Sequence, residues 1–162
     1  MGYTTDFEGS VTVTPPLNES ERTYLWRFAH TRHMDRTSGP YFVDGTDGAI
    51  GHDQGHDPDI RSCNRPPKGQ PGPWCGWVPT KDGTAIEWDS CEKFYDSDAW
   101  MQYLIDHFLR SGAQAEGHKG FEDFTFDHVV NGVIHAQGED PQATWDLIVT
   151  DNAVTIADTP PE

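Results

Sequence analysis

The sequence predicts an α+β fold in which an antiparallel sheet carries two helices on one face. Three observations predict this class: a tryptophan-rich hairpin at residues 74–89, two amphipathic segments that begin near residues 18 and 97, and strand-like alternation near both ends. A length of 162 residues is enough to bury a core within one domain. We therefore expect a single domain over residues 1–162, with a long irregular loop at about 37–73.

The first strand and the first helix follow from the N-terminal quarter of the chain. Residues 7–14 alternate with valine and threonine, which is typical of a strand, and two prolines end the run. Asn18 then has the position of a helix cap, and Glu21 three residues later gives a pattern close to a capping box. The helix is expected to extend to about Met34. Its buried stripe consists of Leu25, Phe28 and Ala29.

The next two strands are predicted by the tryptophan-rich stretch. The Asp82-Gly83 pair lies between two apolar runs, which is a strong hairpin signal. With a two-residue loop Trp77 lies opposite Trp88, and a four-residue loop keeps both on the same face. This face also carries Cys75 and Ile86, so we expect it to be core, whereas Trp74 and Glu87 point the other way.

A second helix is expected from the cap Ser97 to about Arg110. Its apolar residues follow the spacing of one helix face, and Gly112 is placed to end it. This apolar face consists of Trp100, Met101, Leu104, Ile105 and Phe108.

The C-terminal third is expected to add three strands after an acidic, glycine-rich loop at residues 113–127. Residues 129–137 are strand-like, and we interpret Gly132 as a bulge in one long strand rather than as part of a turn. Residues 145–149 and 153–156 flank Asp151-Asn152 as a final hairpin. The complete order best fits a split β-α-β (ferredoxin-like) unit with an extra C-terminal hairpin.

The charge of the chain limits its partners. Eleven Lys and Arg residues stand against 27 Asp and Glu residues, which gives a formal net charge of −16. Such a surface repels a phosphate backbone and an anionic membrane, so we expect neither direct nucleic-acid binding nor membrane binding. Two interpretations of the acidity remain open. It serves solubility, or it forms an acidic face for a basic partner protein, including as a mimic of DNA.

Compartment is inferred from the N-terminus and the cysteines. The first residues contain neither a positive region nor an apolar run, and no segment approaches eighteen apolar residues. The three cysteines form no C-x-x-C pair, which suits a reducing compartment. We therefore expect a cytoplasmic protein.

A metal site is one hypothesis for the histidine- and aspartate-rich loop at residues 44–59. Imidazole and carboxylate ligands suit zinc, manganese or iron, and the candidate ligands are His52, His56 and Asp57. The spacing matches neither the H-E-x-x-H helix nor a calcium loop. A solvated polar loop is the alternative, and no cofactor is expected.

A small basic island suggests a second kind of site. Tyr41, Arg61, Arg65, Lys68 and Trp74 could bind an anionic, nucleotide-like ligand by charge and stacking. In the alternative interpretation Arg65 pairs with a local carboxylate and Trp74 covers the edge of the core.

No catalytic residue is predicted. Cys75 lies on the expected core face, where a thiol is inert, and His107 lies near a helix end. His128 and His135 flank a strand without an evident acid–base partner. The chain therefore does not indicate an enzyme.

Several short motifs resemble a family of small uncharacterised acidic proteins of actinobacteria and their phages. The matching pieces are Met1-Gly2-Tyr3, Asp6-Phe7-Glu8-Gly9-Ser10, Thr14-Pro15-Pro16-Leu17, Asp35-Arg36, Gly39-Pro40-Tyr41-Phe42-Val43, Asn64-Arg65-Pro66-Pro67, Trp74-Cys75, residues 82–89, Lys93-Phe94-Tyr95, Asn131-Gly132 and Gly138-Glu139-Asp140. Cys63 and Cys91 replace a tyrosine and a glycine of the family pattern, so the resemblance implies no metal or disulfide role for them. It implies expression in the cytoplasm of a phage-infected actinobacterial cell.

These observations favour a non-enzymatic acidic accessory protein, of phage or host origin, that binds and modulates a host or phage protein. In the specific form of this hypothesis, the protein inhibits a defence enzyme or a nucleic-acid enzyme. A protein that binds a nucleotide-like anion is the alternative, and a metal-dependent hydrolase is the second alternative.

Overall fold

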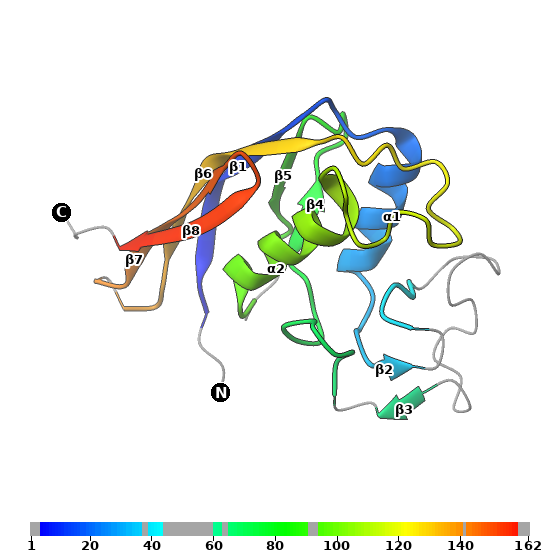
Figure 1. Ribbon diagram of the computed structural model, residues 1–162. Helices are drawn as coiled ribbons and strands as arrows, with labels where there is room; N and C mark the ends of the chain where they lie inside the picture. Colours follow the sequence, from blue (N-terminus) through cyan, green and yellow to red (C-terminus); the bar gives the residue numbers. More distant parts are fainter. Residues whose placement is uncertain are drawn as a thin grey trace.

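The computed structural model describes residues 4–36, 39–43, 60–62, 65–90, 94–140 and 142–158. These residues confirm the α+β class: a six-stranded antiparallel sheet lies beside two α-helices (Figure 1). The sheet has the order β4-β5-β1-β6-β7-β8. Its strands are β1 (Asp6–Thr14), β4 (Trp77–Pro79), β5 (Ala85–Trp88), β6 (Val129–Gln137), β7 (Thr144–Thr150) and β8 (Ala153–Asp158). The helices are α1 (Glu19–Ala29) and α2 (Ser97–Leu104), and α2 continues as a π-helical turn, η1 (Ile105–Leu109).

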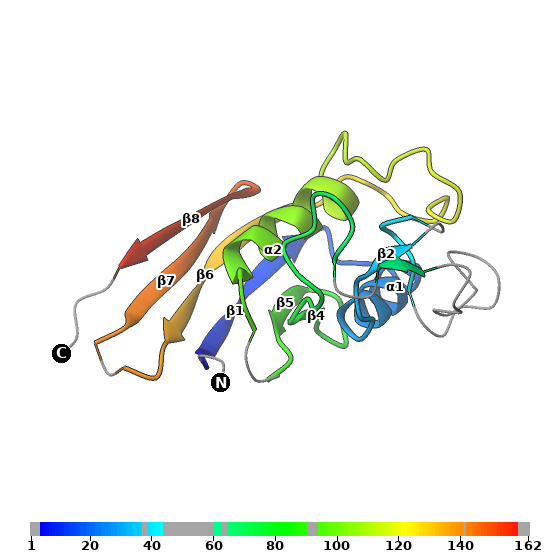
Figure 2. The same ribbon diagram turned by 90° about the horizontal axis from the view of Figure 1, so that it is seen from below.

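The core lies between one face of the sheet and the two helices. α2 contacts both β4 and β8, and α1 contacts β4 (Figures 1 and 2). Trp100 and Phe28 are fully buried here, as their positions on the apolar helix faces predict. The sheet contributes Val11, Val13, Ile86, Val130, Ile134, Leu147 and Val149 to the same hydrophobic cluster.

The helix ends agree with the prediction at one point and differ from it at two. The capping box of α1 is confirmed, because Asn18 and Glu21 exchange two backbone-to-side-chain hydrogen bonds of 2.8 Å. The helix stops at Ala29 rather than near Met34, since the His30 N–H turns back to the Arg27 carbonyl and the next residues leave the helix axis. Ser97 is the first residue of α2 and not its cap. Asp96 precedes it in the left-handed conformation, with a φ of 57°.

The predicted tryptophan hairpin is confirmed. Trp77 pairs with Trp88, and the Thr80 N–H donates to the Ala85 carbonyl at 2.9 Å across a four-residue loop. In the β7–β8 hairpin, Asp151 and Asn152 have φ values of 46° and 74°, which a tight primed turn requires.

The centre of the sheet is one unbroken ladder. β1 and β6 pair from Asp6 opposite Gln137 to Thr14 opposite Val129 without a register shift, so the predicted bulge at Gly132 is wrong. Glycine is required here for another reason. Its φ is 151°, and an added Cβ would lie 2.8 Å from the Val11 Cα.

The described part of the predicted irregular loop contains one short strand. β2 (Asp35–Arg36) and β3 (Ile60–Ser62) form a separate two-stranded sheet. The backbone carbonyl of Arg65 accepts a hydrogen bond of 2.8 Å from the Asp35 N–H, which fixes one end of the loop beside β2.

The side chain of Gln102 connects α2 to the last hairpin. Its Nε2 donates to the Asn152 carbonyl at 3.0 Å, and its Oε1 accepts from the Val154 N–H at 3.0 Å. This contact positions α2 over the end of the sheet. Over the ranges that the structure describes, no helix has both the length and the hydropathy that crossing a bilayer demands.

Candidate functional site

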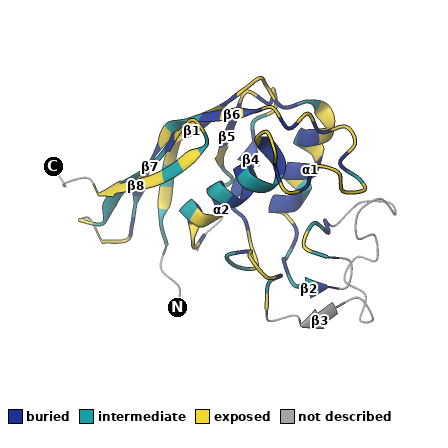
Figure 3. Cartoon of the chain, viewed as in Figure 1, coloured by how far each residue is buried: buried dark blue, intermediate teal, exposed yellow. Residues whose placement is uncertain are grey.

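The sheet face opposite the core is open to solvent in the described fold. Side chains alternate along each strand, so the residues between buried Val11 and Val13 and on either side of them along β1 point outward. Figure 3 shows these exposed positions along the strands. Antiparallel sheets commonly leave one face to solvent, so openness alone does not indicate a function. The composition of the face is therefore the informative feature.

The six strands of this sheet contain no lysine and no arginine. Glu8, Glu87 and Asp146 project from three different strands toward solvent, whereas the single titratable residue of β6 is His135. A surface of one sign over several strands produces a local potential that attracts opposite charge. We call this surface the outer sheet face, and define it as Glu8, Ser10, Glu87, Val133, His135, Asp146 and Ile148.

The register places an apolar centre among these carboxylates. Ser10, Val133 and Ile148 form one row across β1, β6 and β7. Val133 is 52% exposed, which is high for a valine in the middle of a sheet. The next row contains Glu8, His135 and Asp146, and the His135 Nδ1 lies 3.0 Å from an Asp146 oxygen. An apolar centre with a charged border is the usual composition of a protein-binding patch.

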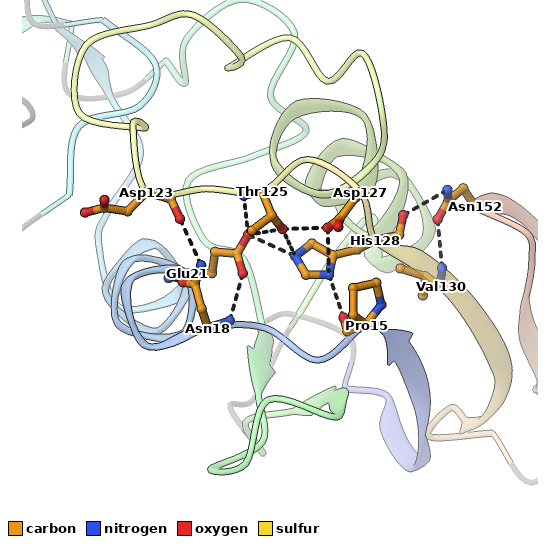
Figure 4. A network of polar contacts seen from close by, with 9 residues as sticks. All are labelled: Pro15, Asn18, Glu21, Asp123, Thr125, Asp127, His128, Val130 and Asn152. Atoms are coloured by element: carbon orange, nitrogen blue, oxygen red, sulfur yellow. Dashed lines mark hydrogen bonds and ion pairs between the residues drawn. The ribbon is translucent and has the colours of Figure 1, made fainter.

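A buried polar network ties α1 to both central strands (Figure 4). Glu21 and His128 are 0% and 1% exposed, and the Glu21 Oε2 lies 2.9 Å from the His128 Nε2. The same oxygen accepts the Thr125 N–H at 3.1 Å. On its other side, the His128 Nδ1 donates to the Pro15 carbonyl at 2.6 Å. The network therefore joins the start of α1, the end of β1 and the start of β6.

The network contains an ion pair. Both ring nitrogens of His128 face acceptors, which fits a doubly protonated imidazolium. Burial alone would lower the pKa of His128, but the hydrogen bond and the charge of Glu21 outweigh it and raise that pKa. Burial would likewise raise the pKa of Glu21, but hydrogen bonds from His128, Asn18 and Thr125 lower it. The pair is fully buried and joins three segments of the chain, so it stabilises the fold.

A second aromatic and histidine group packs around η1. The Tyr41 hydroxyl lies 2.7 Å from the His107 Nδ1, and the Tyr103 ring stacks on the imidazole at 3.8 Å. Burial lowers the pKa of His107 to about 4 and raises the pKa of Tyr41. At neutral pH the hydroxyl therefore donates to a neutral imidazole. This arrangement holds the loop at residues 39–43 against η1.

His33 is buried beside α1, and its protonation makes the stability of the fold depend on pH. Its Nε2–H donates to the Phe28 carbonyl at 2.9 Å, and its ring lies 4.2 Å from that of Phe28. Burial lowers the pKa of His33 to about 4, with a further lowering by the Arg36 charge. Below pH 6.5, the ordinary pKa of histidine, His33 takes up a proton in the unfolded chain but stays neutral in the folded chain. The free energy of unfolding therefore decreases as the pH falls.

We expect the wild type to lose about 2 kcal/mol more than the variant His33→Phe between pH 6.5 and 4.5. Urea unfolding at a series of pH values measures both curves. The substitution itself changes the free energy of unfolding by an amount that does not depend on pH, so the slopes of the two curves against pH are compared. Parallel curves for the two proteins would contradict a neutral, buried His33.

The structure describes four residues of the predicted anion site with their side chains: Tyr41, Arg65, Lys68 and Trp74. Tyr41 packs on His107, whereas Arg65, Lys68 and Trp74 are exposed. No hydrogen bond, ion pair or ring contact between described residues joins any two of these four. Arg61 belongs to β3, and its side chain lies outside the described part. The anion site on these residues stays a prediction.

The predicted metal ligands His52, His56 and Asp57 lie outside the described residues. Within the ranges that are described, no group of three His, Cys, Asp or Glu side chains is arranged to hold a metal ion. Sequence reasoning placed Glu87 on the outward side of the tryptophan hairpin but missed Glu8 and Asp146. Alternation along the predicted strand at residues 7–14 could have placed Glu8 on the face opposite Val11 and Val13.

α1 borders two cavities that sequence reasoning also missed. One, of about 380 Å³, lies between α1 and the β4–β5 turn. The other, of about 250 Å³, lies between α1 and the loop near Phe124. None of the residues of the predicted anion site lines either of them.

Comparison with known proteins found no match among family models, curated proteins or solved structures. Geometry and charge of the described residues therefore carry the assignment of function.

Proposed function

We propose that this chain is a non-enzymatic acidic accessory protein that binds a basic protein partner through its outer sheet face. The observation that carries the proposal is a six-stranded sheet without a single lysine or arginine, whose open face joins an exposed valine to carboxylates from three strands. The net charge of −16 adds long-range attraction to the same class of partner.

The two parts of the surface have different roles in this proposal. Exposed ion pairs contribute only about 0–1 kcal/mol each, so Glu8, Glu87 and Asp146 set association rate and partner choice more than affinity. Burial of Val133 and Ile148 at the centre of the patch supplies the apolar contribution. The partner then needs a basic surface with an apolar residue at its middle.

A protein that binds nucleic acid has such a basic surface, because it must neutralise phosphates. We propose that the outer sheet face competes for this surface, as an inhibitor or mimic of DNA. The resemblance to acidic proteins of actinobacteria and their phages supports a host or phage enzyme in the cytoplasm as the target.

The fold proposal is that β1, α1, β4, β5, α2 and β6 make a split β-α-β, ferredoxin-like unit, to which β7 and β8 add a hairpin. The strand order β4-β5-β1-β6 supports it, because β1 then lies between the third and fourth strands of the unit. This arrangement leaves both helices on one side of the sheet and the carboxylates on the other.

Neutralising the outer sheet face should weaken partner binding about tenfold. The triple variant Glu8→Gln, Glu87→Gln, Asp146→Asn removes three charges from one face of strands β1, β5 and β7. Affinity capture from actinobacterial lysate at low salt identifies the partner. Titration of that purified partner with wild type and variant, at several salt concentrations, then gives the affinities. The variant should also show a smaller salt dependence.

The matched control neutralises three exposed carboxylates of the loop before β6: Glu116→Gln, Glu122→Gln and Asp123→Asn. The change in net charge is the same, so affinity within about twofold of wild type is expected. An equal loss of affinity in both variants would mean that total charge, and not the outer sheet face, causes the effect. If the captured protein does not release bound DNA when this chain is added, the proposed mimicry of DNA is excluded.

A further inference from the structure

The cavity of about 380 Å³ beside α1 differs in charge from the rest of the molecule. Arg22 and Arg27 enter it from α1, and Lys81 enters it from the β4–β5 turn. These are three of the eleven Lys and Arg residues in a chain of net charge −16. Among the described residues, no aspartate or glutamate lines the cavity.

The three cations have no carboxylate partner in the part of the chain that the structure describes. Arg22 is held in place by an Nη1–H hydrogen bond of 2.9 Å to the Leu17 carbonyl, which leaves its other donors available. Two acids are adjacent to these cations in the sequence. Glu21 precedes Arg22, but it is buried and paired with His128. The other, Asp82, follows Lys81. Its Oδ1 accepts hydrogen bonds from Thr80 and Thr84 and is thus turned into the β4–β5 turn.

An aromatic wall stands beside these charges. Trp26 lies one helical turn after Arg22 and lines the same cavity, yet it is 51% exposed. The ring of His30 lies 4.3 Å from its ring, and the His30 Nδ1 bonds the Trp26 carbonyl at 2.7 Å. His30, the residue that follows α1, thereby supports the indole. The hydroxyl-bearing side chains of Thr23 and Thr80 line the cavity too, and add hydrogen-bonding capacity.

We propose that this cavity binds a small anion with a planar aromatic ring, of the nucleoside-monophosphate class. The ring stacks on Trp26, and the phosphate lies among Arg22, Arg27 and Lys81. A cavity of about 380 Å³ is within the range that binds small ligands. The site shares no residue with the outer sheet face, so it is a separate function from partner binding.

The test is calorimetric titration of the full chain with AMP at low salt, with adenosine and inorganic phosphate as separate probes. AMP should bind at least about tenfold more tightly than either probe, because each of them offers only half of the recognition. Trp26→Ala should raise the Kd for AMP about tenfold, and Lys81→Gln about threefold. Both side chains are exposed, so both variants should fold.

Trp74→Ala is the matched control. Trp74 is 46% exposed, similar to Trp26, but it does not line the cavity. Its replacement should leave the Kd within about twofold. The proposal is overturned if AMP gives no binding at millimolar concentration, if phosphate alone binds as tightly as AMP, or if Trp74→Ala weakens binding as much as Trp26→Ala does. None of these results bears on the partner experiment, because the outer sheet face is intact in both variants.

Discussion

Replacing Glu21 by alanine is expected to lower the free energy of unfolding by about 3–5 kcal/mol. The substitution leaves the His128 imidazolium buried without its counter-charge. It also removes the acceptor of the Asn18 and Thr125 backbone N–H groups. A buried charge without a partner and buried donors without acceptors are among the most destabilising changes in a core. Urea unfolding at pH 6, followed by tryptophan fluorescence, measures the loss.

The pH dependence of this loss separates the ion pair from simple packing. Glu21 has a pKa below its ordinary 4.5, so its stabilisation is present above that pH and is lost as the pH falls through the folded value. His128 has a pKa above its ordinary 6.5, so its stabilisation is present below that pH and is lost as the pH rises through the folded value. The difference between wild type and Glu21→Ala should therefore be largest between about pH 4.5 and 6.5.

Glu19→Ala is the control within the same helical turn. Glu19 is exposed, so its loss should cost at most about 1 kcal/mol through the helix dipole. A Glu21→Ala effect as small as that of Glu19→Ala, or one that does not vary with pH, would contradict the buried ion pair.

Gly132→Ala should destabilise the protein by about 3 kcal/mol. A side chain at Gly132 would meet two backbone atoms of β1, at 2.8 Å from the Val11 Cα and 3.1 Å from the Ser10 carbonyl oxygen. Backbone atoms inside a sheet cannot rotate away as a flexible side chain does. The φ of 151° adds backbone strain for any residue other than glycine. Chemical unfolding gives the cost, and amide exchange along β1 and β6 should show where the ladder loosens.

The control Gly117→Ala separates the cost of backbone strain from the cost of the close contact with β1. Gly117 has a φ of 89°, but an added Cβ would meet nothing within 4 Å. This variant should therefore lose only about 1–2 kcal/mol. Equal losses at both positions would mean that the close approach to β1 contributes nothing.

The elements that sequence reasoning predicted well are those fixed by short-range patterns. The capping box needs only Asn18 and Glu21, and the pairing of Trp77 with Trp88 follows from a tight turn between two apolar runs. The apolar stripe of α2 depends on one helical period. In each case the physical cause acts within about one hairpin or one helix.

The features that were missed depend on residues far apart in the chain. His128 has no visible partner in the sequence, because Glu21 precedes it by 107 residues. The same network gives Glu21 a second role that the cap alone does not reveal. Gly132 resembles a bulge until its approach to Val11 of a distant strand is known. The basic cavity likewise needs the β4–β5 turn to meet α1, which no local pattern encodes.

The hydrogen bonds of Gln102 have a consequence for how molecules of this protein meet. An edge strand normally offers its outward backbone groups to any extended chain, and so invites runaway polymerisation. At the start of β8 the outward amide of Val154 and the carbonyl of Asn152 are already occupied by this one side chain. A neighbouring copy must first displace Gln102 to lengthen the ladder there, so the same glutamine that docks α2 also blocks strand addition at the start of β8.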